Sequence, residues 1–154
     1  MKMKNKKGFT LVELLAVIVI LALLVAIAIP STFSISNRLK TNMYCSKIDT
    51  IENAAQLWGE DYRDSFQEKY TYTGPSSTDS NVTETLENLP SQTISVKNLV
   101  EAGALKKDQK EEPYIVDPRD KKSDALYQMK FVVYVKYNRI YVAFPDEVKK
   151  TCDK

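Results

Sequence analysis

Residues 9–29 read FTLVELLAVIVILALLVAIAI, the longest apolar stretch of the chain. From residue 14 to residue 29 it has no charged or polar side chain. As a helix, these 21 residues extend roughly 30 Å, the thickness of one hydrocarbon core. Four lysines lie upstream, at positions 2, 4, 6 and 7, and such a basic flank favours a cytoplasmic N-terminus. We therefore expect a membrane helix followed by an exported region.

Glu13 is the one ionisable side chain within the apolar stretch. A carboxylate costs about 2.5–3.5 kcal/mol at the centre of a membrane helix, and less near the interface. A cleaved secretory signal, with its cleavage site at Ala26-Ile27-Ala28, gains nothing from this charge. A simple signal anchor gains nothing from it either. We therefore expect Glu13 to have a function and a charged partner.

The sequence KGFTLVE at residues 7–13, followed by the apolar stretch, resembles the class III signal of type IV pilins and pseudopilins. The resemblance implies that a prepilin peptidase removes residues 1–8 by cutting between Gly8 and Phe9. It also implies that the new amino group of Phe9 is methylated. Glu13 then corresponds to the family's near-universal glutamate.

The resemblance further implies assembly roles for Phe9, Glu13 and Pro30. The protonated amine of Phe9 in one subunit would pair with the Glu13 carboxylate of a neighbour. This pairing offsets much of the desolvation of both charges and sets the register between subunits. Pro30 lies where pilins commonly carry proline. Since proline removes a backbone hydrogen bond, we expect it to kink or loosen the helix.

The helix is expected to continue into the exported region. Positions 44, 48, 51, 55, 58 and 62 hold Tyr, Ile, Ile, Ala, Trp and Tyr. Spacings of three and four residues are typical of one apolar helix face, and we expect a sheet to cover that face. Gly59 weakens the last turns, so the end of the helix is placed between residues 58 and 66.

A loop and a short helix are predicted next. Residues 67–93 are rich in threonine and serine around Gly74-Pro75, which is typical of a surface loop. Residues 95–105 are predicted as a short helix, with Ser95 as its N-cap and Gly103 at its C-terminal end.

Three strands are predicted in the C-terminal part, at about 113–117, 126–136 and 140–145. The last two are joined by a hairpin turn at Tyr137-Asn138-Arg139. The predicted fold class is therefore α+β, with a long N-terminal helix packed against a small antiparallel sheet, as in pilins. The expected organisation is a cleaved leader at 1–8, a transmembrane and filament-core helix at 9–30, and an exported head at 31–154.

The outer face of the predicted hairpin carries Lys130, Tyr134, Lys136 and Arg139. Interleaved basic and aromatic side chains can bind single-stranded nucleic acid by stacking and phosphate contact. The alternative, which we favour, is a solvated sheet face with cross-strand tyrosine pairs.

The two cysteines, Cys45 and Cys152, would both lie outside the membrane, where disulfides persist. Only one intramolecular pairing is available, and it would attach the C-terminal tail to the long helix. Two free thiols are the alternative, and we favour the disulfide.

The composition excludes several kinds of chemistry. The chain of 154 residues contains no histidine, so it has no Ser-His-Asp or Cys-His nucleophile and no histidine general base. A zinc site would need four thiolates or carboxylates, and only two cysteines exist. A net charge of +2 provides no strong basic field for nucleic acid. We expect no enzymatic activity, no cofactor and no metal.

The resemblance implies a structural subunit of a type IV pilus or pilus-like filament. Its partners would be copies of itself, other pilins, a prepilin peptidase and an inner-membrane platform protein. The chain would lie in the bacterial cytoplasmic membrane before assembly and in a cell-surface filament afterwards. The alternatives are a pseudopilin of a type II secretion system, a subunit of a competence DNA-uptake pilus, a minor pilin that binds DNA or a surface at a tip, and a membrane-anchored domain that never polymerises.

Overall fold

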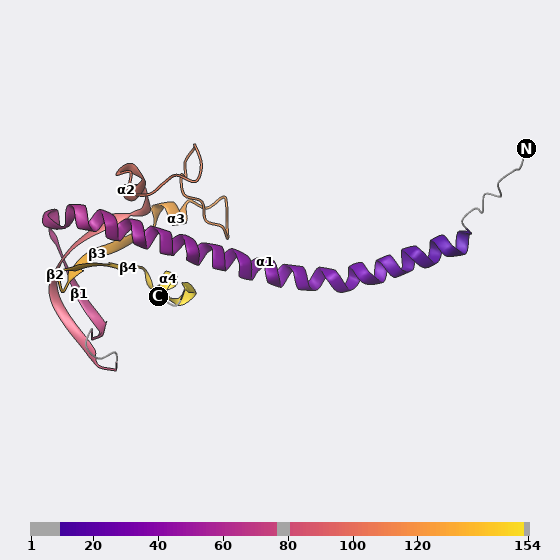
Figure 1. Ribbon diagram of the computed structural model, residues 1–154, viewed down its shortest axis with the longest axis horizontal. Coiled ribbons are helices and arrows are strands. Elements are labelled where there is room, and N and C mark those ends of the chain that lie inside the picture. The colour runs from indigo at the N-terminus through magenta and orange to yellow at the C-terminus, as the bar shows by residue number, and fades with distance from the viewer. Residues whose placement is uncertain (1–9, 77–80, 153–154) are drawn as a thin grey trace, which may run out of the picture. The chain divides into compact units, whose positions relative to one another are not determined.

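The computed structural model describes residues 10–76 and 81–152, without the side chains of residues 27–34. The chain divides into two compact units, Met1–Leu39 and Lys40–Lys154, and helix α1 (Leu11–Tyr62) contributes to both (Figure 1). In the first unit, the described residues are Thr10 and the N-terminal part of α1. The second unit contains all the other elements.

In the second unit, α1 buries one face in the core. Tyr44, Ile48, Ile51 and Ala55 are at most 4% exposed, which confirms most of the predicted apolar face. Trp58 is partly buried and packs against this core.

The C-terminal end of α1 also lies where the sequence places it. Tyr62, the last residue of α1 and of the predicted apolar face, is 49% exposed. The short 3-10 helix η1 (Arg63–Ser65) follows, so α1 ends within the predicted range.

The sheet has four antiparallel strands in the order β1-β2-β3-β4. The strands are β1 (Glu68–Pro75), β2 (Thr83–Ser95), β3 (Lys130–Lys136) and β4 (Arg139–Ala143). Phe131 and Val133 of β3 point into the core shared with α1, where they are at most 2% exposed. The α+β fold with a long N-terminal helix and an antiparallel sheet is confirmed.

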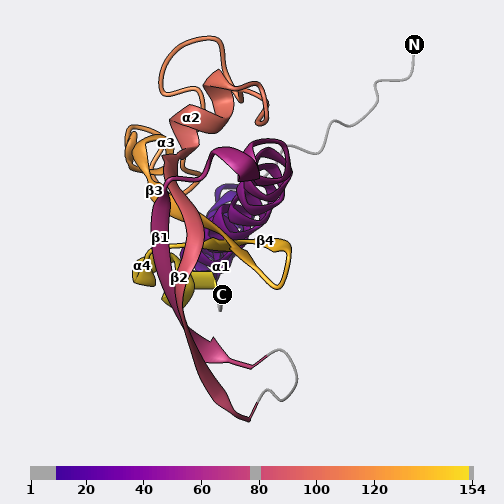
Figure 2. The same ribbon diagram turned by 90° about the vertical axis from the view of Figure 1, so that its left-hand side faces the viewer.

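The predicted surface loop at 67–93 is wrong, because most of it forms the β1–β2 hairpin. The pairing runs from Glu68↔Ser91 to Pro75↔Thr83. Figure 2 shows this hairpin extending beyond β3 and β4, and β2 pairs with β3 only from Ser91 to Ser95. Threonine and tyrosine are favourable strand residues, and the loop prediction gave too much weight to the polarity of the segment.

Helix α2 (Val96–Glu101) lies within the predicted short helix. Ser95 is its N-cap, and its hydroxyl accepts a hydrogen bond from the Asn98 backbone N–H in a capping box. Gly103, just after the helix, has φ of 75°, a conformation that glycine adopts without steric penalty. The Ser95 cap is confirmed, and α2 ends at Glu101, before the predicted limit at residue 105.

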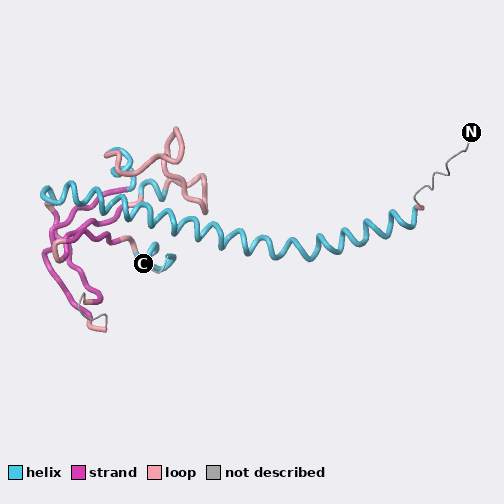
Figure 3. Tube along the Cα trace, in the orientation of Figure 1, coloured by secondary structure: helices cyan, strands magenta, loops and turns pink. Residues whose placement is uncertain are grey.

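The segment between α2 and α3 (Ala125–Gln128) follows a mostly loop path (Figure 3). The predicted strand at 113–117 is wrong, because its backbone bonds to Asp108 instead of to another strand. The Asp108 N–H donates to the Tyr114 carbonyl (2.8 Å), and the Val116 N–H donates to Asp108 Oδ2 (3.0 Å). Ile115 is nevertheless 2% exposed, so its apolar side chain packs in the core from a loop.

The predicted strand at 126–136 is correct only from residue 130 onward. Leu126 and Tyr127 are adjacent, and both are at most 2% exposed in α3. A strand would place these neighbours on opposite faces, whereas a helical turn buries both.

The last part of the chain contains a tight hairpin and a short helix. Tyr137 and Asn138 have φ of 47° and 62° between β3 and β4, so the predicted turn is confirmed. Helix α4 (Asp146–Cys152) follows, and its Val148 is 4% exposed. No helix was predicted at residues 146–152.

Candidate functional site

Thr10 and Glu13 form a capping box at the start of α1. The Thr10 backbone N–H and hydroxyl both donate to Glu13 Oε2, each at 2.9 Å. The Glu13 backbone N–H donates to Thr10 Oγ1 at 3.4 Å. This exchange satisfies donors that the first turn of a helix leaves free. A role for Thr10 was not predicted, although the Thr-x-x-Glu spacing before an apolar run indicates this motif.

The N-terminal part of α1, on both sides of Glu13, presents apolar side chains over its surface. Its large hydrophobic residues from Leu11 to Val25 are between 46% and 79% exposed. Over the described residues, no helix combines the length and apolarity required of a membrane-crossing segment. A surface of this kind needs an apolar environment or an apolar partner to remove it from water.

Three further residues of the predicted processing and assembly set lie at or beyond the edge of the described residues. Gly8 and Phe9 are outside them, so the predicted cleavage and methylation site has no structural description. Pro30 lies within the bounds of α1, and its side chain is outside the described part.

Cys45 of α1 and Cys152 of α4 are joined by a disulfide, with their Cα atoms 5.4 Å apart. Both residues pack against the hydrophobic core. The disulfide therefore connects the last helix of the chain to the long first helix across a sequence separation of 107 residues.

Tyr44, next to Cys45 in the sequence, contacts an ion pair between Asp117 and Arg119 in the loop between α2 and α3. The Arg119 guanidinium lies 3.4 Å from the centre of the Tyr44 ring and donates to Asp117 Oδ2 at 2.7 Å. Burial alone would raise the pKa of Asp117, but the hydrogen bonds and charge of Arg119 hold it below its usual value. The contact between Arg119 and the Tyr44 ring therefore holds the loop between α2 and α3 against α1.

The four candidate nucleic-acid contacts are not brought together as an accessible site. Tyr134 and Lys136 are each 5% exposed, so their prediction as surface contacts is wrong. Lys130 and Arg139 are exposed, but they lie at opposite ends of β3. Lys130 begins the strand, and Arg139 pairs with Lys136 at its other end, roughly 20 Å away along the strand.

Tyr134 and Lys136 are buried because residues of the β1–β2 hairpin cover them. The ring of Tyr72 lies 6.2 Å from that of Tyr134 and 3.6 Å from the Lys136 ammonium. Glu84 forms an ion pair with Lys136 at 2.8 Å and accepts a hydrogen bond from the Tyr137 hydroxyl at 2.9 Å.

These contacts also change the acidity of the buried groups. Burial and the neighbouring tyrosines raise the pKa of Tyr134. Burial would lower the pKa of Lys136, but its hydrogen bond to Glu84 raises it above the usual value. The same hydrogen bond lowers the pKa of Glu84. The arrangement therefore stabilises the sheet and holds the lysine charge inside it.

In the part of the chain that the structure describes, no group of three or more histidine, cysteine, aspartate or glutamate side chains could hold a metal ion.

Comparison with models of known families matches residues 3–29 to the prokaryotic N-terminal methylation motif. Searches of curated proteins and of solved structures found no match. The matched stretch includes Gly8, Phe9, the Thr10–Glu13 capping box and the exposed apolar part of α1. It is the class III signal motif of type IV pilins, which confirms the resemblance seen in the sequence.

Proposed function

We propose that this chain is a prepilin, a structural subunit without enzymatic activity that assembles into a type IV pilus or pilus-like filament. The main support for this proposal is the methylation motif at residues 3–29. Glu13 is the single acidic side chain of that motif, and Thr10 already holds it at the start of α1.

Processing follows from the motif. A prepilin peptidase cuts between Gly8 and Phe9, removes the leader 1–8 and methylates the amine of Phe9. The chain is then held in the cytoplasmic membrane by the helix at residues 9–30, with the head at 31–154 outside. Assembly transfers it to a filament at the cell surface.

Assembly uses the charge that processing creates. The amine of Phe9 in one subunit pairs with Glu13 of its neighbour and fixes the axial register. A carboxylate has about four acceptor positions. The two hydrogen bonds from Thr10 therefore leave room for an amine. In an apolar surrounding, removing either partner leaves an uncompensated charge, which is strongly destabilising.

The remaining partners follow from the same role: copies of this chain, other pilins and an inner-membrane platform protein. Secretion and DNA-uptake filaments carry the same signal, so the surface of the head would distinguish these systems. The buried positions of Tyr134 and Lys136 favour a packing role for that face over DNA contact.

Replacing Glu13 tests the assembly step. In cells that produce the filament, Glu13→Ala should leave cleavage and methylation unchanged and reduce filament yield by roughly a hundredfold, the scale of a loss of about 3 kcal/mol. Glu87→Ala, at an exposed position of β2, is the matched control and should assemble normally. Normal filaments from Glu13→Ala contradict the proposed pairing.

A further inference from the structure

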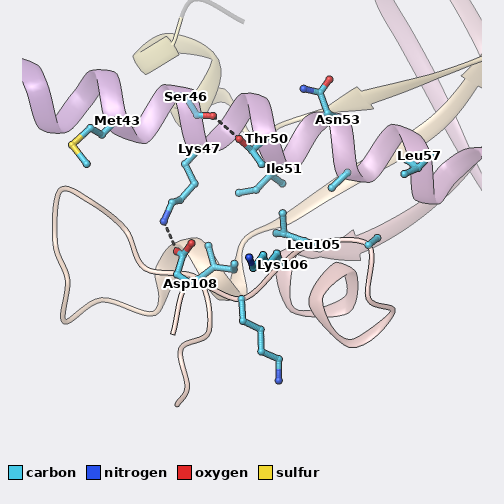
Figure 4. Close-up of a pocket in the computed structure, with 14 residues that line it drawn as sticks. Met43, Ser46, Lys47, Thr50, Ile51, Asn53, Leu57, Leu105, Lys106 and Asp108 are labelled. Atoms are coloured by element: carbon cyan, nitrogen blue, oxygen red, sulfur yellow. Dashed lines mark hydrogen bonds and ion pairs between the residues drawn. The ribbon is translucent and has the colours of Figure 1, made fainter. Parts of the chain in front are cut away.

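A groove of about 670 Å³ lies within the second unit, between α1 and the loop that follows α2. Figure 4 shows the side chains of α1 on one side and those of the loop on the other. Small-molecule sites in proteins are concave, mostly apolar and about 300–1,000 Å³ in volume. The groove lies within that range, so its size suits a small molecule.

The floor of the groove is apolar. Ile51 and Ala54 from α1 and Leu105 and Ile115 from the loop line it. All four are at most 8% exposed and belong to the hydrophobic core. An apolar ligand on this floor would extend the core and remove further apolar surface from water.

The groove is elongated along α1. Its lining on this helix begins at Met43 and ends at Leu57, a distance of roughly 21 Å as helix. Met43 is 53% exposed and Leu57 is 64% exposed, so both ends present apolar surface to solvent. A single acyl chain is long, narrow and apolar, whereas a compact ring system would leave most of this length uncovered.

The charged side chains that line the groove are three lysines and one aspartate. Lys47 forms an ion pair with Asp108, so these two charges offset each other. The Lys107 ammonium lies 3.7 Å from the centre of the Tyr114 ring. Lys106 is exposed and has no hydrogen bond or ion pair with the residues that the structure describes. Two positive charges therefore remain at the rim, and they favour an anionic ligand group.

The groove is already formed in the single chain. The Lys47 ammonium also donates a hydrogen bond to the Val116 carbonyl at 2.9 Å, so α1 and the loop are connected by two polar contacts. A preformed site loses little free energy to ordering when a ligand enters.

We infer that this groove binds a long-chain fatty acid in its carboxylate form. The acyl chain lies on the apolar floor, and the carboxylate stays at the rim beside Lys106 and Lys107. Burying a carboxylate without partners is costly, and this orientation keeps the charge near both lysines and near water. The inference goes beyond the proposed function, since it assigns a ligand to the head and does not depend on filament assembly.

Photo-labelling of the full chain tests this inference. The chain is isolated from membranes in polymer-bounded lipid particles, because detergent would compete for the groove. The probe is palmitic acid with a diazirine in its acyl chain, and mass spectrometry locates the label after digestion with trypsin. The tryptic peptide of residues 48–63 contains the α1 side of the groove from Thr50 to Leu57. We expect this peptide to be labelled, and excess unlabelled palmitic acid should remove most of the label.

Charge reversal at the rim distinguishes a bound carboxylate from unspecific partition. The Lys106→Glu, Lys107→Glu double variant should lower labelling of the 48–63 peptide about tenfold, because two attractive charges become repulsive. The Lys121→Glu, Lys122→Glu double variant is the matched control. It makes the same change at exposed positions of the same loop outside the groove, and it should be labelled like wild type. The uncharged methyl ester of the probe should label wild type and the Lys106→Glu, Lys107→Glu variant equally.

A larger side chain in the groove is the second test. Thr50 is exposed and lines the groove, so Thr50→Trp should occupy part of it and lower labelling by both the acid and the ester. Thr71→Trp is the control, since Thr71 is exposed on β1 outside the groove, and it should be labelled like wild type. Thermal unfolding of each variant establishes that the head remains folded.

The outcomes separate the inference from the proposed function. Labelling of the 48–63 peptide that unlabelled acid does not displace, or that both lysine double variants leave unchanged, overturns the inference. A wild-type chain unlabelled at this peptide also overturns it, including one whose groove is covered by another protein. A chain that binds the acid and retains Met1 contradicts the proposed function and leaves the inference intact.

Discussion

Gly59 of α1 lies so close to Ile140 of β4 that a Cβ atom at position 59 would be 2.7 Å from Ile140 Cγ2. It would also be 2.9 Å from Val133 Cγ1 on β3. Both partners are at most 7% exposed, and their β-branched methyl groups have few other rotamers available. The sequence predicts only that Gly59 weakens the helix, whereas in the structure Gly59 permits the close approach of helix and sheet.

Gly59→Ala should therefore destabilise the protein although alanine is the better helix former. The helix gains about 1 kcal/mol, and overpacking in the core costs about 1–3 kcal/mol. We expect a net loss of up to about 2 kcal/mol in the free energy of unfolding, measured by denaturant titration of the purified full chain in mild detergent. Glu60 is the neighbouring residue and is exposed, so Glu60→Ala should change the free energy of unfolding by less than about 0.5 kcal/mol. A Gly59→Ala protein more stable than wild type contradicts the close approach.

Reduction of the disulfide between Cys45 and Cys152 should lower the free energy of unfolding by roughly 2–5 kcal/mol. The bridge spans a sequence separation of 107 residues, and closing so long a loop restricts the unfolded chain strongly. The measurement compares denaturant unfolding with and without reductant. The Cys45→Ser, Cys152→Ser double variant should respond like the reduced wild type and be unaffected by reductant. Identical curves for oxidised and reduced wild type would show that the disulfide contributes nothing.

The ion pair of Asp117 and Arg119 should make stability sensitive to acid. The pKa of Asp117 in the folded protein lies below its ordinary value of 3.8. Its contribution to stability is therefore fully present above the unfolded pKa and is lost as the pH falls through the folded pKa.

Asp117→Asn should accordingly lower the free energy of unfolding at pH 7 by about 1–2 kcal/mol, a modest value because solvent screens the partly exposed Arg119. Below pH 4 the difference in the free energy of unfolding between Asp117→Asn and wild type should become smaller. Arg119→Met should raise the pKa of Asp117, measured by NMR of its carboxyl carbon, because burial then acts without the opposing charge. A wild-type acid profile that matches Asp117→Asn at every pH would exclude this role of the pair.

The features that were predicted correctly depend on local patterns. The spacing of Tyr44, Ile48, Ile51 and Ala55 predicts the buried face of α1 without knowledge of its partner. The Ser95 cap and the Tyr137-Asn138 turn follow from residue preferences at single positions. The methylation motif is equally local, so the N-terminal part of the candidate site was recognised from the sequence.

The features that were missed depend on contacts distant in the sequence. The polar composition of residues 68–95 led to the prediction of a loop where the β1–β2 hairpin forms. Alternation along β3 predicts that Lys136 is exposed, but this hairpin buries it. The segment around Ile115 alternates like a strand, but its backbone bonds to Asp108. Patterns of hydrophobicity do not contain this information, because each of these positions is decided by a partner elsewhere in the chain.

Mass spectrometry of the mature N-terminus tests whether this chain is processed as a prepilin. The chain is isolated from the membrane and filament fractions of cells that express the peptidase, and its N-terminal peptide is sequenced. We predict a chain that begins with N-methylated Phe9 and lacks residues 1–8. A mature chain that retains Met1, or one cut after Ala28 in the manner of a secretory signal, would contradict processing as a prepilin.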